Sequence, residues 1–377
     1  MDAKRFIEGL NTLGADFFTG VPDSLLSPFC NAIMHECGVC PDKHVVAANE
    51  GAAAALAAGY YLATGKPAVI YMQNSGIGNA VNPICSLLND QVYAIPAIFV
   101  VGWRGEPGVK DEPQHVYQGE VTLRMLDCLG IAYAVVSKES TEEDFRRMLE
   151  GFAPILQSGR QVAFVVRKGA LETSVKMQYT SDAPMTREYI VKTVADHAGQ
   201  RDVFVCTTGK LSREMFEIRE NSGQGHEKDF LTVGSMGHSV MIAMGIAAQK
   251  PERKVYCLDG DGAVLMHMGS LAVAGMHKVA NLVHLVVNNG AHETVGGLPT
   301  VAGGLKLSAV AQALGYCQVY RAQNEAELTH ALESAAKDEG PVFIEAVSDL
   351  FSRDDLGRPT TTPRQNKAAL MDYLEGK

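Results

Sequence analysis

The sequence lacks the features that mark several classes of protein. None of its apolar runs is long enough for a membrane-spanning helix, and its charged N-terminal segment is not followed by the apolar core of a secretory signal. Basic residues are outnumbered, with 33 Lys and Arg against 43 Asp and Glu and a net charge of -10, which argues against a nucleic-acid-binding surface. We therefore predict no membrane partner and no nucleic-acid partner.

The spacing of the cysteines predicts neither a zinc motif nor a disulfide framework. Of the 8 cysteines, only Cys37 and Cys40 lie close together, without a second pair or a histidine at zinc-ligand spacing. Most of the others lie inside apolar runs, where cysteine packs as a small hydrophobic residue. This usage is typical of reduced thiols, and we predict a cytoplasmic protein.

The composition indicates a globular protein with more than one core, because 377 residues exceed the usual size of a single domain and 46% of them are hydrophobic. Short runs rich in Val and Ile alternate with helical patterns, which is typical of parallel sheets covered by helices on both faces. We expect strands at 45–48, 67–72, 97–101, 131–136 and 161–166, and again at 203–207, 254–259, 282–288 and 342–347.

A polar stretch separates the two halves. Between Lys168 and Thr186 the alternation stops and residues that favour loops gather. We therefore predict an α/β protein built of two doubly wound parallel-sheet domains, 1–175 and 185–377, with no middle domain.

The most informative segment is Lys254–Gly297. One strand ends at Gly260-Asp261-Gly262, a single helix follows, and a second strand ends at Asn288-Asn289. Parallel geometry puts these groups side by side at the carboxyl ends of two strands, the edge at which open α/β sheets bind ligands. Glycines let the backbone approach a phosphate, and carboxylate, amide and carbonyl oxygens suit Mg²⁺. Either end alone could be a plain strand-end turn, but the pair at this spacing favours a site.

This pattern resembles the diphosphate and magnesium motif of the thiamine diphosphate-dependent enzymes, in which GDG is followed at similar spacing by NN. The resemblance implies thiamine diphosphate and Mg²⁺ as cofactors, with Gly260, Asp261, Gly262 and Asn289 at the diphosphate. It also implies that the metal is held by the side chains of Asp261 and Asn289 and by the backbone carbonyl of Ala291.

A second feature of that family is a buried glutamate, which hydrogen-bonds the pyrimidine ring and lets the amino group of the cofactor act as a base. Glu50 matches it, because it follows a strand and opens a helix made almost entirely of Ala, Gly, Leu and Tyr. An acid in the first turn of a helix is usually a surface residue that complements the helix dipole. This helix lacks a polar face, so we expect Glu50 beside buried surface and predict a catalytic role.

A third feature is the glycine-rich turn within FLTVGSMGHSV, residues 230–240. Such turns mean little alone, and Met236 could simply fill the core. In the family, the corresponding turn offers a backbone carbonyl to the cofactor amino group and an apolar wedge beneath the cofactor. The resemblance therefore assigns Gly234, Ser235 and Met236 to cofactor binding.

Chain length and several segments resemble one group of the family, the short phosphonopyruvate decarboxylases. These segments are GVPDSLLSPF (20–29), NEGAAAALAAGYYLATGK (49–66), GWRGEPGVKDEPQH (102–115) and NNGAHETVGGLPT (288–300). The resemblance implies a carboxy-lyase that converts 3-phosphonopyruvate to phosphonoacetaldehyde and CO₂ in phosphonate biosynthesis. It also implies a homo-oligomer, at least a dimer, with active sites between subunits.

The residues themselves favour an anionic substrate. Asp23 and Ser24 lie in a strand-end turn that could present N–H groups and a hydroxyl to an anion. Arg104 follows a strand, where it could bind a phosphonate or carboxylate through two hydrogen bonds. It could equally be a solvated loop charge paired with Glu106. We predict that Asp23, Ser24 and Arg104 bind the substrate.

Four further residues complete the predicted site. Asn74 and Ser75 lie in a glycine-rich loop that could hold substrate or merely turn the chain, and we predict substrate contact. A single histidine is usually structural, and the sequence has 11 of them. His115 and His292 are predicted as catalytic proton donors because their segments match the family and lie near the predicted site.

Two other functions remain open at this point. The near alternative is decarboxylation of another 2-oxo acid, such as sulfopyruvate or pyruvate. The alternative of another class is a non-catalytic regulatory protein that binds a nucleotide or diphosphate. No GxGxxG follows the first predicted strand, which makes a dinucleotide the less favoured ligand.

Overall fold

The computed structural model describes residues 1–376, with the backbone only at Thr294, so Lys377 at the end of the predicted second domain lies outside it. The chain divides into two compact units. The first contains Met1–Gln178 and His292–Leu298, and the second contains Tyr179–Ala291 and the chain from Pro299 onward. The change of unit after Gln178 falls inside the predicted dividing segment, whereas no sequence pattern signalled that His292–Leu298 groups with the first unit.

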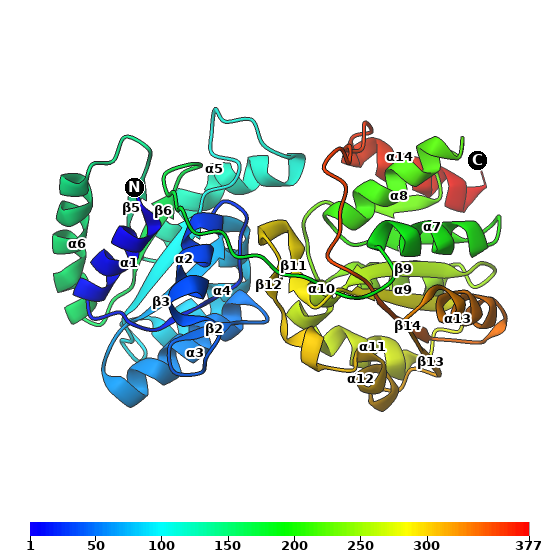
Figure 1. Ribbon diagram of the computed structural model, residues 1–377, viewed down its shortest axis with the longest axis horizontal. Helices are drawn as coiled ribbons and strands as arrows, with labels where there is room; N and C mark the ends of the chain where they lie inside the picture. The colour runs from blue at the N-terminus through cyan, green and yellow to red at the C-terminus, as the bar shows by residue number, and fades with distance from the viewer. Residues whose placement is uncertain (377) are drawn as a thin grey trace. The chain divides into compact units, whose positions relative to one another are not determined.

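The first unit is a six-stranded parallel sheet with helices packed against it (Figure 1). Its strand order, β2-β1-β3-β4-β6-β5, requires crossover connections, as parallel strands do. The strands are β1 (Phe18–Gly20), β2 (His44–Val46), β3 (Ala68–Gln73), β4 (Ala97–Gly102), β5 (Ala132–Val136) and β6 (Val162–Val166). The helices are α1 (Ala3–Thr12), α2 (Ser27–Cys37), α3 (Glu50–Thr64), α4 (Ile77–Pro83), α5 (Pro113–Cys128) and α6 (Glu142–Gln157).

The second unit repeats this architecture with the strand order β13-β14-β10-β9-β7-β8. Its strands are β7 (Val203–Cys206), β8 (Asp229–Leu231), β9 (Val255–Gly260), β10 (Leu282–Asn288), β13 (Gln318–Ala322) and β14 (Val342–Val347), and β11 (Ala291–His292) pairs separately with β12 (Leu298–Pro299). Its helices are α7 (Arg187–His197), α8 (Lys210–Asn221), α9 (Ser239–Gln249), α10 (Asp261–Met266), α11 (Gly269–His277), α12 (Leu307–Ala313), α13 (Glu325–Lys337) and α14 (Pro363–Glu375).

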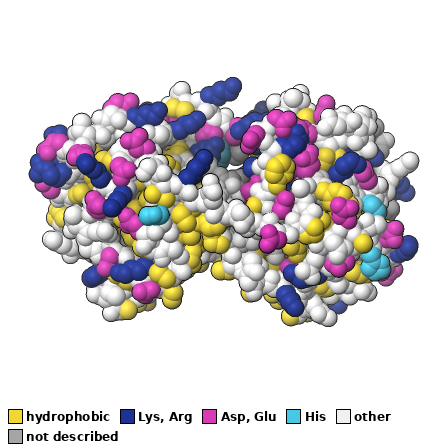
Figure 2. Space-filling view, in the orientation of Figure 1, with side chains coloured by type: hydrophobic (Ala, Val, Ile, Leu, Met, Phe, Trp, Pro, Cys, Tyr) yellow, Lys and Arg dark blue, Asp and Glu magenta, His cyan; other side chains and the backbone are white. Residues whose placement is uncertain are grey.

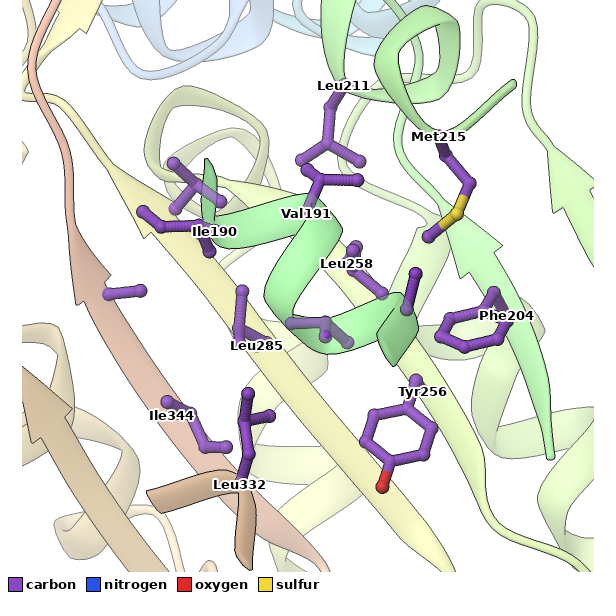
Figure 3. Packing of buried hydrophobic residues seen from close by; sticks show 14 of the residues in the cluster. Ile190, Val191, Phe204, Leu211, Met215, Tyr256, Leu258, Leu285, Leu332 and Ile344 are labelled. Atoms are coloured by element: carbon purple, nitrogen blue, oxygen red, sulfur yellow. The ribbon is translucent and has the colours of Figure 1, made fainter. Parts of the chain in front are cut away.

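Each face of the second sheet has its own apolar core. On one face, Phe204, Tyr256 and Leu258 of the strands pack against side chains of α7, α8 and α13, such as Val191 and Met215 (Figure 3). On the other face, α9, α11 and α12 cover a second cluster that includes Cys257, Val286 and Phe343. Burial on both faces is what the near-continuous apolar strands require.

The two parallel sheets confirm the predicted fold class, and all nine predicted strands are present. Five of the described strands were not predicted: β1 and β8 have only 3 residues each, β11 and β12 have only 2 residues each, and β13 lies at a sheet edge. The single helix expected after Gly262 was wrong, because α10 ends at Met266 and α11 begins at Gly269. His267 leaves the helical conformation, with φ -135° and ψ 49°, and its ring packs against His238.

Within the described chain, we find no helix that combines the length and the apolarity needed to cross a membrane. Acidic and basic side chains are intermixed on the face shown in Figure 2.

Gly119 of α5 is a point of close backbone approach, where a Cβ atom would lie 1.8 Å from the carbonyl oxygen of Gly105. We expect Gly119→Ala to lower the free energy of unfolding by about 1–3 kcal/mol, as overpacking does, and to lower the urea midpoint. The matched change Gly151→Ala in α6 places a Cβ with no described atom within 4 Å. It should stabilise by up to about 1 kcal/mol, because Ala favours helix over Gly. Equal shifts in the two variants would contradict this account.

Candidate active site

Glu50 is a buried carboxylate at the start of α3, with 5% of its surface exposed. The side chain of Asn49 caps the helix by accepting a hydrogen bond from the Ala52 amide at 2.8 Å. Asn79 Nδ2 donates to Glu50 Oε2 at 2.8 Å. Gly76 packs directly on the carboxylate, since a Cβ there would lie 2.3 Å from Oε1. The loop after β3 therefore encloses Glu50, as the lack of a polar helix face predicted.

Arg104 lies just beyond β4 and is bound by Asp111 through two hydrogen bonds, from Nε to Oδ2 at 2.8 Å and from Nη2 to Oδ1 at 2.5 Å. Its Nη1 donates to Ser24 Oγ at 3.2 Å. The alternative partner Glu106 instead pairs with Arg167. Burial opposes ionisation of Asp111, but hydrogen bonds from Arg104 and from backbone amides outweigh it and hold its pKa well below the usual range. Arg104 is thus an oriented cation rather than a solvated loop charge.

Asn74 holds the backbone of Arg104 in place. It is completely buried, and its Nδ2 donates to the Arg104 carbonyl oxygen and to Thr122 Oγ1, both at 2.8 Å. Its Oδ1 accepts from the Arg104 amide at 3.2 Å. Because these bonds use both the oxygen and the nitrogen of the side-chain amide, we interpret Asn74 as a positioning residue for Arg104, and its contact with substrate stays a prediction.

Asp23 and Ser75 are joined through Gln73, a residue that the sequence reasoning missed. Ser75 Oγ donates to Gln73 Oε1 at 2.7 Å, and Gln73 Nε2 donates to Asp23 Oδ1 at 2.7 Å. Asp23 also accepts from the Leu25 amide at 3.0 Å. Burial raises the pKa of Asp23, which is only 3% exposed. Gln73 ends β3, and its place at a strand end was the signal available in the sequence.

The two candidate histidines lie in separate elements, His115 in α5 and His292 in β11. His115 is in the first turn of α5, and burial, together with the positive charge of Arg104, lowers its pKa. His292 opens the segment that groups with the first unit, and burial lowers its pKa to about 4.

In the second unit, Asp261 and Asn288 occupy neighbouring strand ends. β9 and β10 pair in parallel with Gly260 opposite Val287, so the next residues, Asp261 and Asn288, follow at the same edge. Asp261 is 4% exposed, and Thr300 Oγ1 donates to its Oδ2 at 2.6 Å. Burial raises the pKa of Asp261 to about 6, although the Thr300 hydrogen bond opposes the shift.

The Asn288–Ala291 turn is fixed by hydrogen bonds. Asn289 Oδ1 accepts from the Ala291 amide at 3.1 Å, and Gly290 has the left-handed φ of 65°. The Gly290 carbonyl accepts from the Thr300 amide at 2.8 Å, so Thr300 ties this turn to Asp261. Asn288 Nδ2 donates to Glu345 Oε1 at 2.9 Å. Thr300 and Glu345 were not among the predicted site residues, although Thr300 ends the motif NNGAHETVGGLPT.

The donor groups of this edge fit a hard divalent cation. Asp261 supplies a buried carboxylate, and Asn289 and Ala291 supply amide and carbonyl oxygens on a fixed turn. Oxygen ligands of this kind suit Mg²⁺, and a cation would favour the ionised form of the buried carboxylate. A Cβ at Gly260 would meet no described atom within 4 Å, so the backbone next to Asp261 has open space on this side.

The turn at Gly234–Gly237 has an unusual backbone. Gly234, Ser235 and Gly237 have φ values of 68°, 47° and 87°, a region that residues with a Cβ rarely adopt. The Gly234 amide donates to Thr208 Oγ1 at 2.9 Å, and a Cβ on Gly237 would lie 2.7 Å from the ring of His267. A non-glycine residue held in this conformation is typical of functional turns.

Both halves of the chain match families of known proteins. Residues 3–126 match the thiamine pyrophosphate enzyme N-terminal TPP binding domain, and residues 207–346 match the C-terminal TPP binding domain. A phosphonopyruvate decarboxylase of Streptomyces viridochromogenes is 34% identical, over 96% of this chain and 92% of that protein. One of Streptomyces hygroscopicus is 33% identical, over 97% and 92%. Sulfopyruvate decarboxylase subunit beta of Methanothermobacter thermautotrophicus is 34% identical, but over 38% of this chain and 71% of that subunit.

The chain therefore belongs to the thiamine pyrophosphate enzymes and, within them, to the family of the phosphonopyruvate decarboxylases. These matches confirm the predicted family, its decarboxylating lyase class, and thiamine diphosphate as the cofactor of both α/β domains. The matched ranges leave residues 127–206 between the two family domains, and this stretch contains β5, α6, β6, α7 and β7, which are parts of the two sheet units.

Proposed function

We propose that the chain decarboxylates 3-phosphonopyruvate with thiamine diphosphate and Mg²⁺, consuming one proton and releasing CO₂ and phosphonoacetaldehyde. The observation that carries this proposal is the similarity to two phosphonopyruvate decarboxylases over 96% and 97% of the chain. A sulfopyruvate decarboxylase that matches as a single protein is only 25% identical, over 66% of this chain. The proposal includes a role in phosphonate biosynthesis. It also includes a cytoplasmic homo-oligomer of at least two chains with active sites between subunits.

In this proposal, the second unit anchors the cofactor. The side chains of Asp261 and Asn289 and the carbonyl of Ala291 hold Mg²⁺, and Thr300 orients Asp261 through its 2.6 Å hydrogen bond. Gly260, Gly262 and the turn Gly234–Met236 bring backbone close to the cofactor. When bound, the thiazolium ring of the cofactor accepts the electron pair released as CO₂ leaves.

The first unit supplies the activating acid, the anion site and a proton. Glu50 binds the pyrimidine nitrogen of the cofactor. Arg104 binds an anionic group of the substrate, with Ser24 beside it and Asn74 fixing its backbone. The Ser75–Gln73–Asp23 chain shapes the adjoining wall. His115 and His292 are the proposed donors of the proton that replaces the lost carboxylate.

The test is CO₂ release by purified protein from 3-phosphonopyruvate, sulfopyruvate and pyruvate, each with and without thiamine diphosphate and Mg²⁺. We expect cofactor-dependent turnover that strongly favours the phosphonate. Equal turnover of pyruvate would refute the phosphonate assignment and keep the decarboxylase. Bound cofactor without turnover of any acid would refute the enzymatic proposal and favour a binding protein.

Removing the Arg104 charge should weaken substrate binding selectively. We expect Arg104→Gln to raise KM for 3-phosphonopyruvate about 100-fold, since losing one partner of a desolvated ion pair costs about 2–5 kcal/mol. We expect Arg104→Gln to raise KM less for pyruvate than for 3-phosphonopyruvate, because pyruvate lacks the phosphonate. The control is Arg167→Gln, which removes a neighbouring paired arginine outside the proposed site. A KM unchanged in Arg104→Gln would remove this residue from the substrate site.

A further inference from the structure

Three buried side chains meet on one face of the second sheet. Cys257 and Asp259 are two residues apart on β9 and therefore point to the same face. His284 of β10 lies directly opposite Cys257 in the strand register. The sulfur, a carboxylate oxygen and a ring nitrogen all lie within 4.8 Å of one another. The three residues are 0%, 1% and 0% exposed, inside the apolar cluster covered by α9, α11 and α12.

Two polar atoms of this cluster face each other without a hydrogen bond. Among the described atoms, neither Asp259 Oδ2 nor His284 Nε2 has a hydrogen-bond partner, and they are 3.7 Å apart. This separation is too long for a hydrogen bond. Two ligands of one tetrahedral zinc ion, each bound at about 2.0–2.1 Å, lie about 3.4 Å apart, which is close to the observed spacing. Leaving both groups unsatisfied in an apolar core would be costly.

Neighbouring groups support a ligand at this point. The other ring nitrogen of His284, Nδ1, is 2.9 Å from the hydroxyl of Tyr316. Metal-binding histidines commonly hold their second nitrogen in this way, which leaves the first nitrogen free for the ion. Thr207 follows β7 beside Asp259, since Cys206 pairs with Leu258, and its buried Oγ1 also has no partner among the described residues.

We propose that Cys257, Asp259 and His284 bind one Zn²⁺ ion in the core of the second unit, separate from the Mg²⁺ proposed at Asp261. Thiolate, imidazole and carboxylate together suit zinc, whereas Mg²⁺ prefers oxygen ligands alone. The thiolate and the carboxylate balance the two positive charges, so the filled site is neutral within its apolar surroundings. The other carboxylate oxygen, Asp259 Oδ1, accepts from the Gly260 amide at 3.0 Å, so a water molecule would take the fourth position. Because the site is closed, the ion enters as the chain folds.

The test is to produce the protein in medium supplemented with Zn²⁺ or with Co²⁺ and to purify it with thiamine diphosphate and Mg²⁺ present. We expect about one zinc per chain by elemental analysis, as in a structural site. The cobalt form should show thiolate-to-cobalt charge-transfer absorption. Cobalt that replaces Mg²⁺ at Asp261 has only oxygen ligands and cannot give this band, so the two sites are distinguished.

Cys257→Ala should lose both the zinc and the charge-transfer band. The matched control is Cys206→Ala, because Cys206 is also 0% exposed and lies on the neighbouring strand, but belongs to the opposite core. Wild-type protein without zinc and without the band would overturn the proposal. A band that persists in Cys257→Ala would overturn it too. The zinc content and the cobalt absorption of the wild-type protein test the proposal even if a variant fails to fold.

Discussion

Glu50→Gln is expected to lower the rate of decarboxylation by about 100- to 10,000-fold, the usual contribution of acid–base catalysis, while the cofactor stays bound. The amide keeps the shape of the side chain and its contact with Gly76 but cannot supply the negative charge. A hydrogen bond from Asn79 already orients the carboxylate, so the loss is expected in chemistry rather than in folding. Single-turnover CO₂ release and the cofactor content of the purified variant measure the two effects separately.

The control for this experiment is Glu142→Gln. Glu142 is the first residue of α6, as Glu50 is of α3, but its side chain is 72% exposed. Any general effect of an acid on the helix dipole should therefore occur in both variants, and the catalytic loss only in Glu50→Gln. If the Glu50 variant decarboxylated at the wild-type rate, the proposed role of this residue would be wrong.

Asp261→Asn is expected to raise the dissociation constant for Mg²⁺ by at least about 100-fold, because the change removes the only carboxylate among the proposed ligands. Retention of thiamine diphosphate should fall with it, and chelation of the metal from the wild-type protein should produce the same loss. Titration of the cofactor-free protein with Mg²⁺ and thiamine diphosphate, followed by calorimetry, measures both constants.

Variants of Thr300 separate the effect of the Asp261 charge on Mg²⁺ binding from the effect of its orientation. Thr300→Val removes the hydrogen bond to Asp261 but leaves the carboxylate, so it should weaken Mg²⁺ binding by only about 10-fold. Thr300→Ser, which keeps the hydroxyl, should bind nearly as the wild type does. An Asp261→Asn variant that retains metal and cofactor with wild-type affinity would exclude Asp261 as a ligand.

Much of the fold was predictable because its strands are buried on both faces. The runs PAVIYM and LVHLVVN contain little but apolar residues, and β3 and β10 lie within one residue of them. By contrast, β13 was missed because an edge strand can expose polar residues such as Gln318. The break between α10 and α11 was also missed, since it depends on the packing of His267 against His238, which is distant in sequence.

In the candidate site, too, residues marked by a local sequence pattern were predicted, whereas partners that are distant in sequence were not. Asp261 and Glu50 stand at strand-to-helix junctions, which a sequence pattern can locate. Their partners are set by the fold: Thr300 is 39 residues from Asp261, and Asn79 is 29 residues from Glu50. For Arg104, the sequence offered Glu106 as the nearby acid, but the chain turns so that Asp111 binds it instead.

Every residue of strand β9 is constrained by its surroundings. Tyr256 and Leu258 face one core, Cys257 and Asp259 face the other, and Asp261 follows at the edge. Since side chains alternate along a strand, each residue has an environment that its neighbours cannot share. If every residue were substituted one at a time, we expect most substitutions at every position of β9 to lower stability or activity. At the exposed Gln318 of the edge strand β13, we expect many substitutions to be tolerated.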